Sequence, residues 1–300
     1  MTERVRIGTR GSELALWQAN DVARRLATVG CETEIVTIRT TGDRRTDVSL
    51  ASIGGKGLFI KELEEALERG AIDIAVHSLK DVPSIVPEQF SLAAFLERAD
   101  PRDAWLQRDG TPLTALPAGA VVGTSAPRRR AQLLARHANL KIESIRGNVD
   151  TRLKKMRSGA FAGIVLAAAG LARLGRTSEV TSMFAVEEML PAAGQGIVAI
   201  ETLREIELVR RINHRPSEIA ALCERGVLQA FGERLDCYSC IAVHATVLSE
   251  HEVSIRAFMS DYDATRVIRA AATGERGRAV GEVAEQLMRQ GAVELLGVSA

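Results

Sequence analysis

Apolar and polar positions in the first hundred residues follow two different periods. Residues 5–9 alternate as in a short strand, and apolar residues at helical spacing predict a helix from Ser12 to Gly30. A strand at 34–40, a helix at 58–69 and an apolar strand at 72–76 follow. This alternation of strand and helix is typical of an α/β sheet with buried parallel strands.

A second series of the same kind begins where the chain turns polar, around residues 99–102. Strands are predicted at 120–123, 141–145 and 163–167, each followed by a helix, at 127 onward, 148–158 and 168–174. Pro191–Gly196 reads as a hinge or crossover back to the first series. One long helix is predicted from Leu203 to Phe231.

After Cys237 the pattern changes to strands in immediate succession. Three antiparallel strands and a closing helix are predicted at 241–248, 253–259, 266–272 and 280–289. We therefore expect an α/β protein with two lobes and a smaller C-terminal α+β domain. The predicted domains are 1–98 with 196–214 (first lobe), 102–192 (second lobe) and 218–300 (C-terminal domain).

Composition narrows the class of protein. Apolar residues make up 46% and charged residues 26%, which is ordinary for a folded domain. A net charge of +1 argues against a nucleic-acid binder. The chain shows neither an apolar signal core nor a run of about 18 apolar residues, and four cysteines form no disulfide framework. We expect a cytoplasmic protein without a membrane partner.

Residues His77–Pro83 are the first candidate for chemistry. They follow a buried strand, and open α/β sheets bind ligands beyond the carboxyl ends of their strands. Asp81 is a candidate acid, base or electrostatic stabiliser, and Ser78 a candidate hydrogen-bond partner. The alternative is that Asp81 caps a turn before Pro83 and that Lys80 is its ion-pair partner.

Arginine is the dominant basic residue, with 33 Arg against 6 Lys. Several arginines stand at turns where a predicted strand leads into a helix N-terminus, which is a natural anion site. The three turns contain Arg10 with Ser12, Thr124 with Arg128 and Arg129, and Arg146 with Arg152. Their recurrence predicts a ligand with several negative groups, although any one of them could be an ordinary surface residue.

Two further motifs are ambiguous. The glycine-rich segment around Lys56 lacks the spacing of a phosphate loop, so it is either a flexible loop near the site or a plain turn. Cys237 and Cys240 have the spacing of a zinc or redox motif, but only His244 is near enough to add a third zinc ligand. We expect no metal; covalent attachment at one cysteine and a structural role stay open.

Taken together, these segments resemble the porphobilinogen deaminase (hydroxymethylbilane synthase) family over the full chain. The residues that carry the resemblance are Arg10, Ser12 and 14–19, 54–59, 75–83, 100–104, 122–125, 146–149, 151–153 and 190–196. The resemblance implies two lobes like those of periplasmic binding proteins. It also implies condensation of four porphobilinogen molecules into a linear tetrapyrrole on the way to haem-type pigments.

The resemblance also implies site roles. Asp81 would be the catalytic carboxylate. A dipyrromethane cofactor would be joined through a thioether to one cysteine of the C-terminal domain. The residues implied to bind the cofactor are Lys56, Ser78, Lys80, Thr124, Arg128, Arg129 and Arg146. Those implied to bind substrate are Arg10, Ser12, Arg146, Arg152, Arg173 and Gln195.

Two departures from the family pattern bear on these roles. Arg234-Leu235-Asp236 replaces the usual small residues before the cofactor cysteine, and Cys240 replaces a proline after it. Matching the strand that follows assigns the cofactor to Cys237, with Cys240 as the fallback. Ala126 stands where a serine is common, which removes one carboxylate contact.

Other functions remain as alternatives to the monomeric deaminase that we expect. One is a non-catalytic two-lobed carboxylate-binding protein, which would have no use for Cys237 or Asp81. Another is a family member impaired in cofactor assembly.

Overall fold

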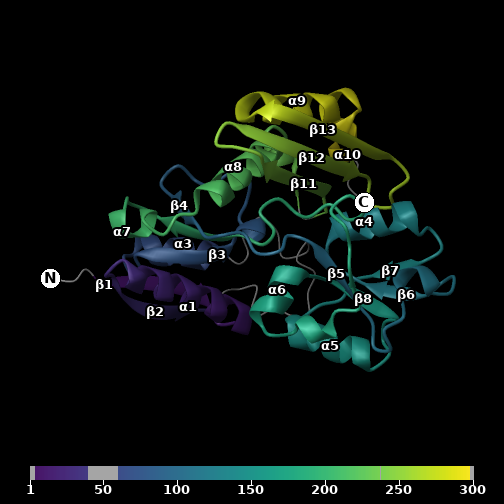
Figure 1. The fold of residues 1–300 in the computed structure, drawn as a ribbon, viewed down its shortest axis with the longest axis horizontal. Coiled ribbons are helices and arrows are strands. Elements are labelled where there is room, and N and C mark those ends of the chain that lie inside the picture. The colour runs from purple at the N-terminus through teal and green to yellow at the C-terminus, as the bar shows by residue number, and fades with distance from the viewer. Residues whose placement is uncertain (1–3, 40–59, 237, 298–300) are drawn as a thin grey trace. The chain divides into compact units, whose positions relative to one another are not determined.

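The computed structural model describes residues 4–39, 60–236 and 238–297 (Figure 1). The chain divides into two compact units, Met1–Ala99 with Gly196–Leu222 and Asp100–Gln195 with Cys223–Ala300. Within the described residues, the first unit contains one sheet and the second contains two. The separate C-terminal domain at 218–300 stays a prediction.

The first unit is built on a five-stranded sheet of order β2-β1-β3-β10-β4, with β10 antiparallel to both neighbours. The strands are β1 (Arg4–Arg10), β2 (Glu32–Ile38), β3 (Ile74–Ser78), β4 (Ser91–Phe95) and β10 (Val198–Thr202). Helices α1 (Glu13–Thr28) and α3 (Lys61–Glu68) pack against different apolar clusters of this sheet. Ser12 caps α1 as predicted, since its side chain accepts a hydrogen bond from the Ala15 N–H.

The first sheet of the second unit repeats this layout, with the order β7-β6-β8-β5-β9. Its strands are β5 (Asp103–Leu106), β6 (Val121–Gly123), β7 (Lys141–Glu143), β8 (Gly163–Ala167) and β9 (Ser182–Met183). In each sheet, three parallel strands lie beside an antiparallel one, which is β10 in the first unit and β5 in the second. Each of these two strands is the first that the chain forms after it passes from one unit into the other. This confirms the predicted α/β class with two similar lobes.

Side-chain alternation on β5 and β8 explains why helices cover both faces of this sheet. Ala104 and Leu106 belong to one apolar cluster, with side chains of α5 (Val149–Arg157) and α6 (Ala168–Arg173). Trp105 points the other way, into a cluster with Leu133 of α4 (Pro127–Arg136).

The C-terminal part contains the smaller α+β element that was predicted. Strands β11 (Cys240–Val247), β12 (Glu252–Ser260) and β13 (Val267–Glu275) form an antiparallel sheet. Helices α9 (Arg276–Arg289) and α10 (Ala292–Gly297) pack on it, and α4 contacts β11 and β12 (Figure 1). Gln286 of α9 and Gln290, which follows the helix, hydrogen-bond the backbone of Ala271 and Arg269 on the edge strand β13.

The long helix predicted from 203 to 231 is wrong. The structure has two helices there, α7 (Glu207–Arg210) and α8 (Arg215–Gln229). The chain breaks at His214, whose N–H donates to the Phe95 carbonyl at 2.8 Å. Pro216 then occupies the first turn of α8, where its missing N–H costs nothing.

Strand β3 differs from its prediction in a way that matters for the site. It covers 74–78 instead of 72–76. Residue 72 is not yet in the strand, because its N–H donates to the carbonyl of Ala66 in α3. His77 and Ser78 therefore lie on the strand, and the 3-10 turn η1 (Leu79–Asp81) carries Asp81.

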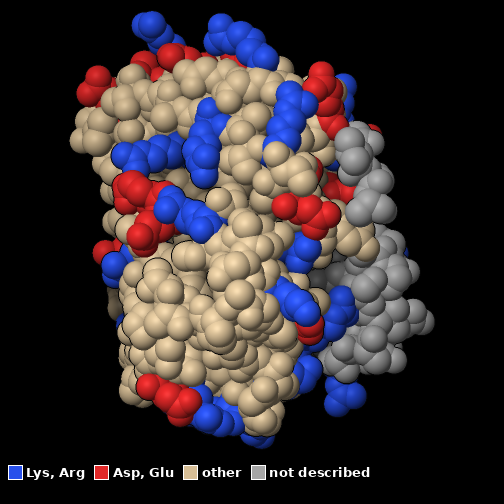
Figure 2. Space-filling model, turned by 90° about the vertical axis from the view of Figure 1, so that its right-hand side faces the viewer, with Lys and Arg blue, Asp and Glu red and all other residues tan. Residues whose placement is uncertain are grey.

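Two properties of the surface follow from the described residues. None of their helices combines the length and apolar character that crossing a membrane requires. On the face shown in Figure 2, described basic side chains are interspersed with acidic ones and form no single continuous patch.

Candidate functional site

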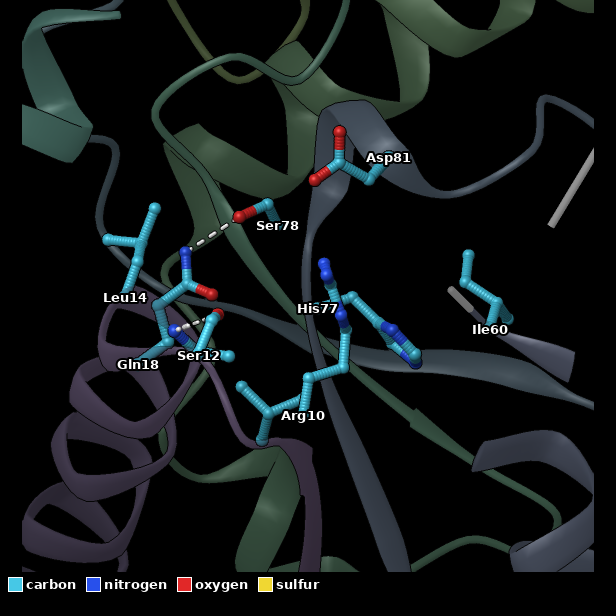
Figure 3. Close-up of a pocket in the computed structure, with 10 residues that line it drawn as sticks. Arg10, Ser12, Leu14, Gln18, Ile60, His77, Ser78 and Asp81 are labelled. Carbon is cyan, nitrogen blue, oxygen red and sulfur yellow. Dashed lines mark hydrogen bonds between the residues drawn. The ribbon is translucent and has the colours of Figure 1, made fainter. Parts of the chain in front are cut away.

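A pocket of about 70 Å³ lies in the first unit, where β1 and β3 end. Its lining includes Arg10, Ser12, Ser78 and Asp81, so four residues predicted separately from the sequence lie together. Figure 3 shows the Arg10 and Asp81 side chains directed into the same space. They meet because the carboxyl ends of adjacent parallel strands share one edge of the sheet.

Gln18 also lines this pocket and was not identified from the sequence. It is buried on α1, and its Nε2 donates to Ser78 Oγ at 2.7 Å (Figure 3). The sequence feature that could have indicated Gln18 is a polar residue on the apolar face of the predicted helix, between the buried Ala15 and Val22.

His77, which had no predicted role, also lines the pocket and forms a buried pair with Glu201. Its Nε2 lies 2.9 Å from Glu201 Oε2 on β10, and both side chains are buried. Burial, followed by the charge of Glu201, raises the pKa of the nearby Glu64 carboxyl. The pair joins β3 to β10 at the wall of the pocket, which His77 lines.

In the second unit, Arg128 and Arg129 converge on Asp103, which was not predicted as a site residue. Arg128 donates to Asp103 at 2.6 Å and to Gln195 Oε1 at 2.8 Å, and Arg129 donates to Asp103 at 2.8 Å. Gln195 Nε2 also donates to Asp103, at 2.9 Å. All four residues are buried.

This buried cluster has a defined charge. Although burial disfavours an ionised carboxyl, the charges and hydrogen bonds of Arg128 and Arg129 hold the pKa of Asp103 well below its usual range. Two guanidinium groups and one carboxylate leave a net charge of +1. The two arginines therefore donate hydrogen bonds to groups of the protein itself, whereas the sequence analysis assigned them to the binding of cofactor carboxylates.

Four other predicted residues follow the parallel strands of the same sheet. Thr124 follows β6, Arg146 follows β7, and Arg152 and Arg173 lie in the helices after β7 and β8. The three arginines are partly exposed. Because β7, β6 and β8 are neighbours, topology brings these strand ends to one edge of the sheet.

Gly147 shapes the turn between Arg146 and Arg152. Its φ is +108°, and a Cβ there would meet the Thr151 side chain at 2.6 Å. Asn148 caps α5 by accepting from the Thr151 N–H, and Arg152 Nε donates to the Gly147 carbonyl at 2.7 Å. The Arg152 guanidinium therefore lies against the turn that contains Gly147.

The cysteine motif is described on either side of Cys237. Asp236 Oδ1 accepts from the Tyr238 N–H at 2.9 Å and from the Ser239 hydroxyl at 2.8 Å, which closes a turn. Cys240 starts β11 and is buried, and burial above all raises the pKa of its thiol to about 12.

Three predicted residues remain. Lys80 lies on η1, is exposed and does not line the pocket beside Asp81. Lys56 and Cys237 lie outside the described residues.

A second, larger pocket of about 480 Å³ lies in the second unit, beside β12 and β13. Its lining includes Arg256, which pairs with Glu187, and Arg269, whose guanidinium lies over the Phe258 ring. None of the predicted site residues within the described ranges lines it.

Comparison with known proteins gives consistent matches. The family described as "Porphobilinogen deaminase, dipyromethane cofactor binding domain" matches residues 5–211. A "Porphobilinogen deaminase" of Desulfitobacterium hafniense is 43% identical over 300 residues, covering 97% of this chain and 96% of the relative. One from Burkholderia pseudomallei is 45% identical over 298 residues, covering 95% and 90%. Among solved structures, the methionine-binding protein MetQ aligns with a TM-score of 0.45 at 14% identity, covering 70% of this chain and 88% of its own.

Proposed function

This chain belongs to the porphobilinogen deaminase family, and on that premise we propose that it is a transferase that joins four porphobilinogen molecules head to tail. Each condensation releases ammonia, and the product is the linear tetrapyrrole hydroxymethylbilane. The observation that carries the proposal is the pocket in which Asp81 meets Arg10, Ser12 and Ser78. A substrate with two acidic side chains and a developing positive charge needs both kinds of group.

Asp81 supplies the negative charge. Loss of ammonia leaves a positive charge on the substrate, and a carboxylate held next to the pyrrole nitrogen stabilises it most where water is excluded. The same carboxylate oxygens can accept and return a proton. The position of Asp81 on the short turn after β3 supports this role, because the turn places it at the strand-end pocket.

The other pocket residues orient the substrate carboxylates. Gln18 Nε2 donates to Ser78 Oγ, so the Ser78 hydroxyl hydrogen remains available for a substrate carboxylate. Ser12 Oγ accepts from the Ala15 N–H, which leaves its hydroxyl hydrogen available in the same way. Arg10 adds a planar, charged donor pair.

The second unit offers donors that suit the carboxylates of a dipyrromethane. Thr124, Arg146, Arg152 and Arg173 provide hydroxyl and guanidinium groups at the strand ends. When bound, the cofactor supplies the pyrrole end from which the chain grows. Lys56 and Lys80 remain in the proposed cofactor-binding set.

Arg128 and Arg129 take a modified role in this proposal. Their donors are largely used by Asp103, so they would attract cofactor carboxylates mainly through the net positive charge of the buried cluster. Gln195, buried in the same cluster, would hold Arg128 and Asp103 in place instead of contacting substrate.

We assign the covalent attachment to Cys237. The fallback, Cys240, is 2% exposed, and burial raises the pKa of its thiol to about 12, so it holds almost no thiolate near neutral pH. A buried, protonated thiol is a poor nucleophile for thioether formation. This supports Cys237, the other cysteine of the motif.

Intact-mass measurement of the purified protein tests the assignment and the function together. We expect a mass excess of two linked pyrrole units that is lost in Cys237→Ala and kept in Cys240→Ala, and the reverse pattern would refute it. Ammonia release from porphobilinogen separates the alternatives. A carboxylate-binding protein would show neither mass excess nor ammonia, and an impaired member would bind substrate without turnover. That the enzyme acts as a cytoplasmic monomer stays a prediction.

A further inference from the structure

An arginine and two tyrosines lie in consecutive contact in the second unit, and the proposed reaction does not use them. The guanidinium carbon of Arg130, on α4, lies 4.5 Å from the ring centroid of Tyr262. The Tyr262 ring meets the Tyr238 ring edge to face, at 6.5 Å between centroids and 76° between planes. We call Arg130, Tyr262 and Tyr238 the aromatic clasp.

Hydrogen bonds fix the arginine of the clasp. Arg130 donates to the Ile142 carbonyl at 2.7 Å and to Asp263 Oδ1 at 2.8 Å, while its buried Nε finds no partner among the described residues. The guanidinium thus gives up one hydrogen bond and keeps its flat face against Tyr262. Contact with an aromatic face is the interaction that such a planar cation favours.

The hairpin turn between β12 and β13 presents Tyr262 in a constrained conformation. Ala264 has a φ of +57°, which is uncommon for a residue with a Cβ. Asp261 holds the turn by accepting from Thr265 Oγ1 at 2.5 Å and from the Arg266 N–H at 2.8 Å. Such strain persists only where neighbouring contacts over-determine it.

The clasp attaches the residue next to Cys237. Tyr238 is 49% exposed and Tyr262 39% exposed, so burial in a core does not order these rings. On the other side of the motif, Cys240 packs in one apolar cluster with Ala131, the residue after Arg130 on α4. Both flanks of the cysteine motif are therefore attached to one helix.

That helix also begins with the buried arginine cluster. Arg128 donates to the Leu190 carbonyl at 3.0 Å, and Leu190 belongs to the same apolar cluster as Cys240 and Ala131. The start of α4 and the start of β11 thus share one packing unit.

We propose that Arg130 and Tyr262 are positioning residues that hold Tyr238, the residue after Cys237, at a fixed place against α4, the helix that also carries Arg128. This inference rests on the proposed function, because the role of the clasp depends on a cofactor being attached to the neighbouring Cys237. The clasp itself is a property of the fold and can be tested without the reaction.

The first test measures hydrogen exchange in the backbone of residues 235–241. It uses the full chain with Cys237→Ser, in which no thioether can form, so that all variants are compared in one state. Tyr262→Ala and Arg130→Ala are expected to speed exchange of these amides about tenfold, because the contacts that order Tyr238 are lost. Wild-type exchange in both variants would overturn the proposal.

Two further variants separate positioning from general loosening. Tyr262→Phe keeps the ring that makes both contacts and is expected to exchange like wild type; exchange as fast as in Tyr262→Ala contradicts the clasp. Arg269→Ala removes a comparable contact, since that guanidinium lies 5.4 Å from the Phe258 ring centroid on the same sheet. Acceleration at 235–241 in Arg269→Ala would also count against the proposal.

The second test uses the enzyme with Cys237 intact. Intact mass is expected to show less than half the wild-type share of cofactor-loaded chains in Tyr262→Ala, with loading restored in Tyr262→Phe. Equal loading in all three proteins would contradict the positioning role. If the wild-type protein itself carries no cofactor, the proposed function fails, and the exchange measurement still decides on the clasp.

Discussion

The buried carboxylate of Asp103 provides the most quantitative prediction. Asp103→Asn has nearly the same volume, so it creates no cavity and changes mainly charge and hydrogen bonding. Asp103 accepts from Arg128 at 2.6 Å and from Arg129 at 2.8 Å. An amide replaces one acceptor oxygen with a donor and removes the negative charge that both guanidinium groups contact.

The magnitude follows from burial. The side chain of Asp103 is 0% exposed, and those of Arg128 and Arg129 are each 6% exposed. Removing one partner of such a pair leaves buried charge uncompensated, which costs about 3–5 kcal/mol. We expect the free energy of unfolding of the second unit to fall by about that amount. The control Asp109→Asn, whose pair with Arg108 is largely exposed, is expected to leave the midpoint unchanged.

Trp105 provides the assay. It is fully buried on β5, two residues after Asp103, and the second tryptophan, Trp17, lies in the first unit. In a Trp17→Phe background, urea unfolding followed by tryptophan fluorescence therefore reports on the second unit. A loss of unfolding free energy below about 1 kcal/mol for Asp103→Asn would refute the view that Asp103 and the two arginines interact strongly in a site without water.

The pH dependence gives a second check on the same variant. The pKa of Asp103 is lowered in the folded protein, so its contribution is present above the unfolded pKa of about 3.9 and is lost as the pH falls through the folded value. The stability gap between wild type and Asp103→Asn should stay constant from about pH 5 to 8 and shrink only below about pH 4. A gap that changes near neutral pH would implicate a different group.

Four further variants test the proposed site. Asp81→Asn should fold normally and lose at least about 100-fold in turnover, because the charge that stabilises the cation is gone; near wild-type ammonia release would make Asp81 a turn cap. Arg146→Leu and Arg152→Leu should stall after some additions, visible as enzyme-bound intermediates by mass, and a normal product yield would make them surface residues. Gln18→Ala should raise KM roughly fivefold with kcat within about twofold, because Ser78 loses its orienting donor; an unchanged KM would contradict this.

Local patterns in the chain were enough to predict the α/β class and one half of the site. Strand β8 was predicted at its observed bounds, and β1, β6 and α5 within a residue or two. Arg10 and Asp81 could be predicted as neighbours because adjacent parallel strands end at one edge. Strands β4, β5, β9 and β10 were missed, although β10 is as short and as buried as β8.

Contacts between distant segments were decided only by the tertiary structure. Asp103 lies 25 residues from Arg128 and 92 from Gln195, and no local period indicates that these polar groups are buried together. The same holds for Arg130 and Asp263, which are 133 residues apart. Hydrophobic period determines which strands and helices form, since it acts over a few residues. Which charges become buried, and therefore paired, depends on how whole elements pack, and that is a property of the folded chain.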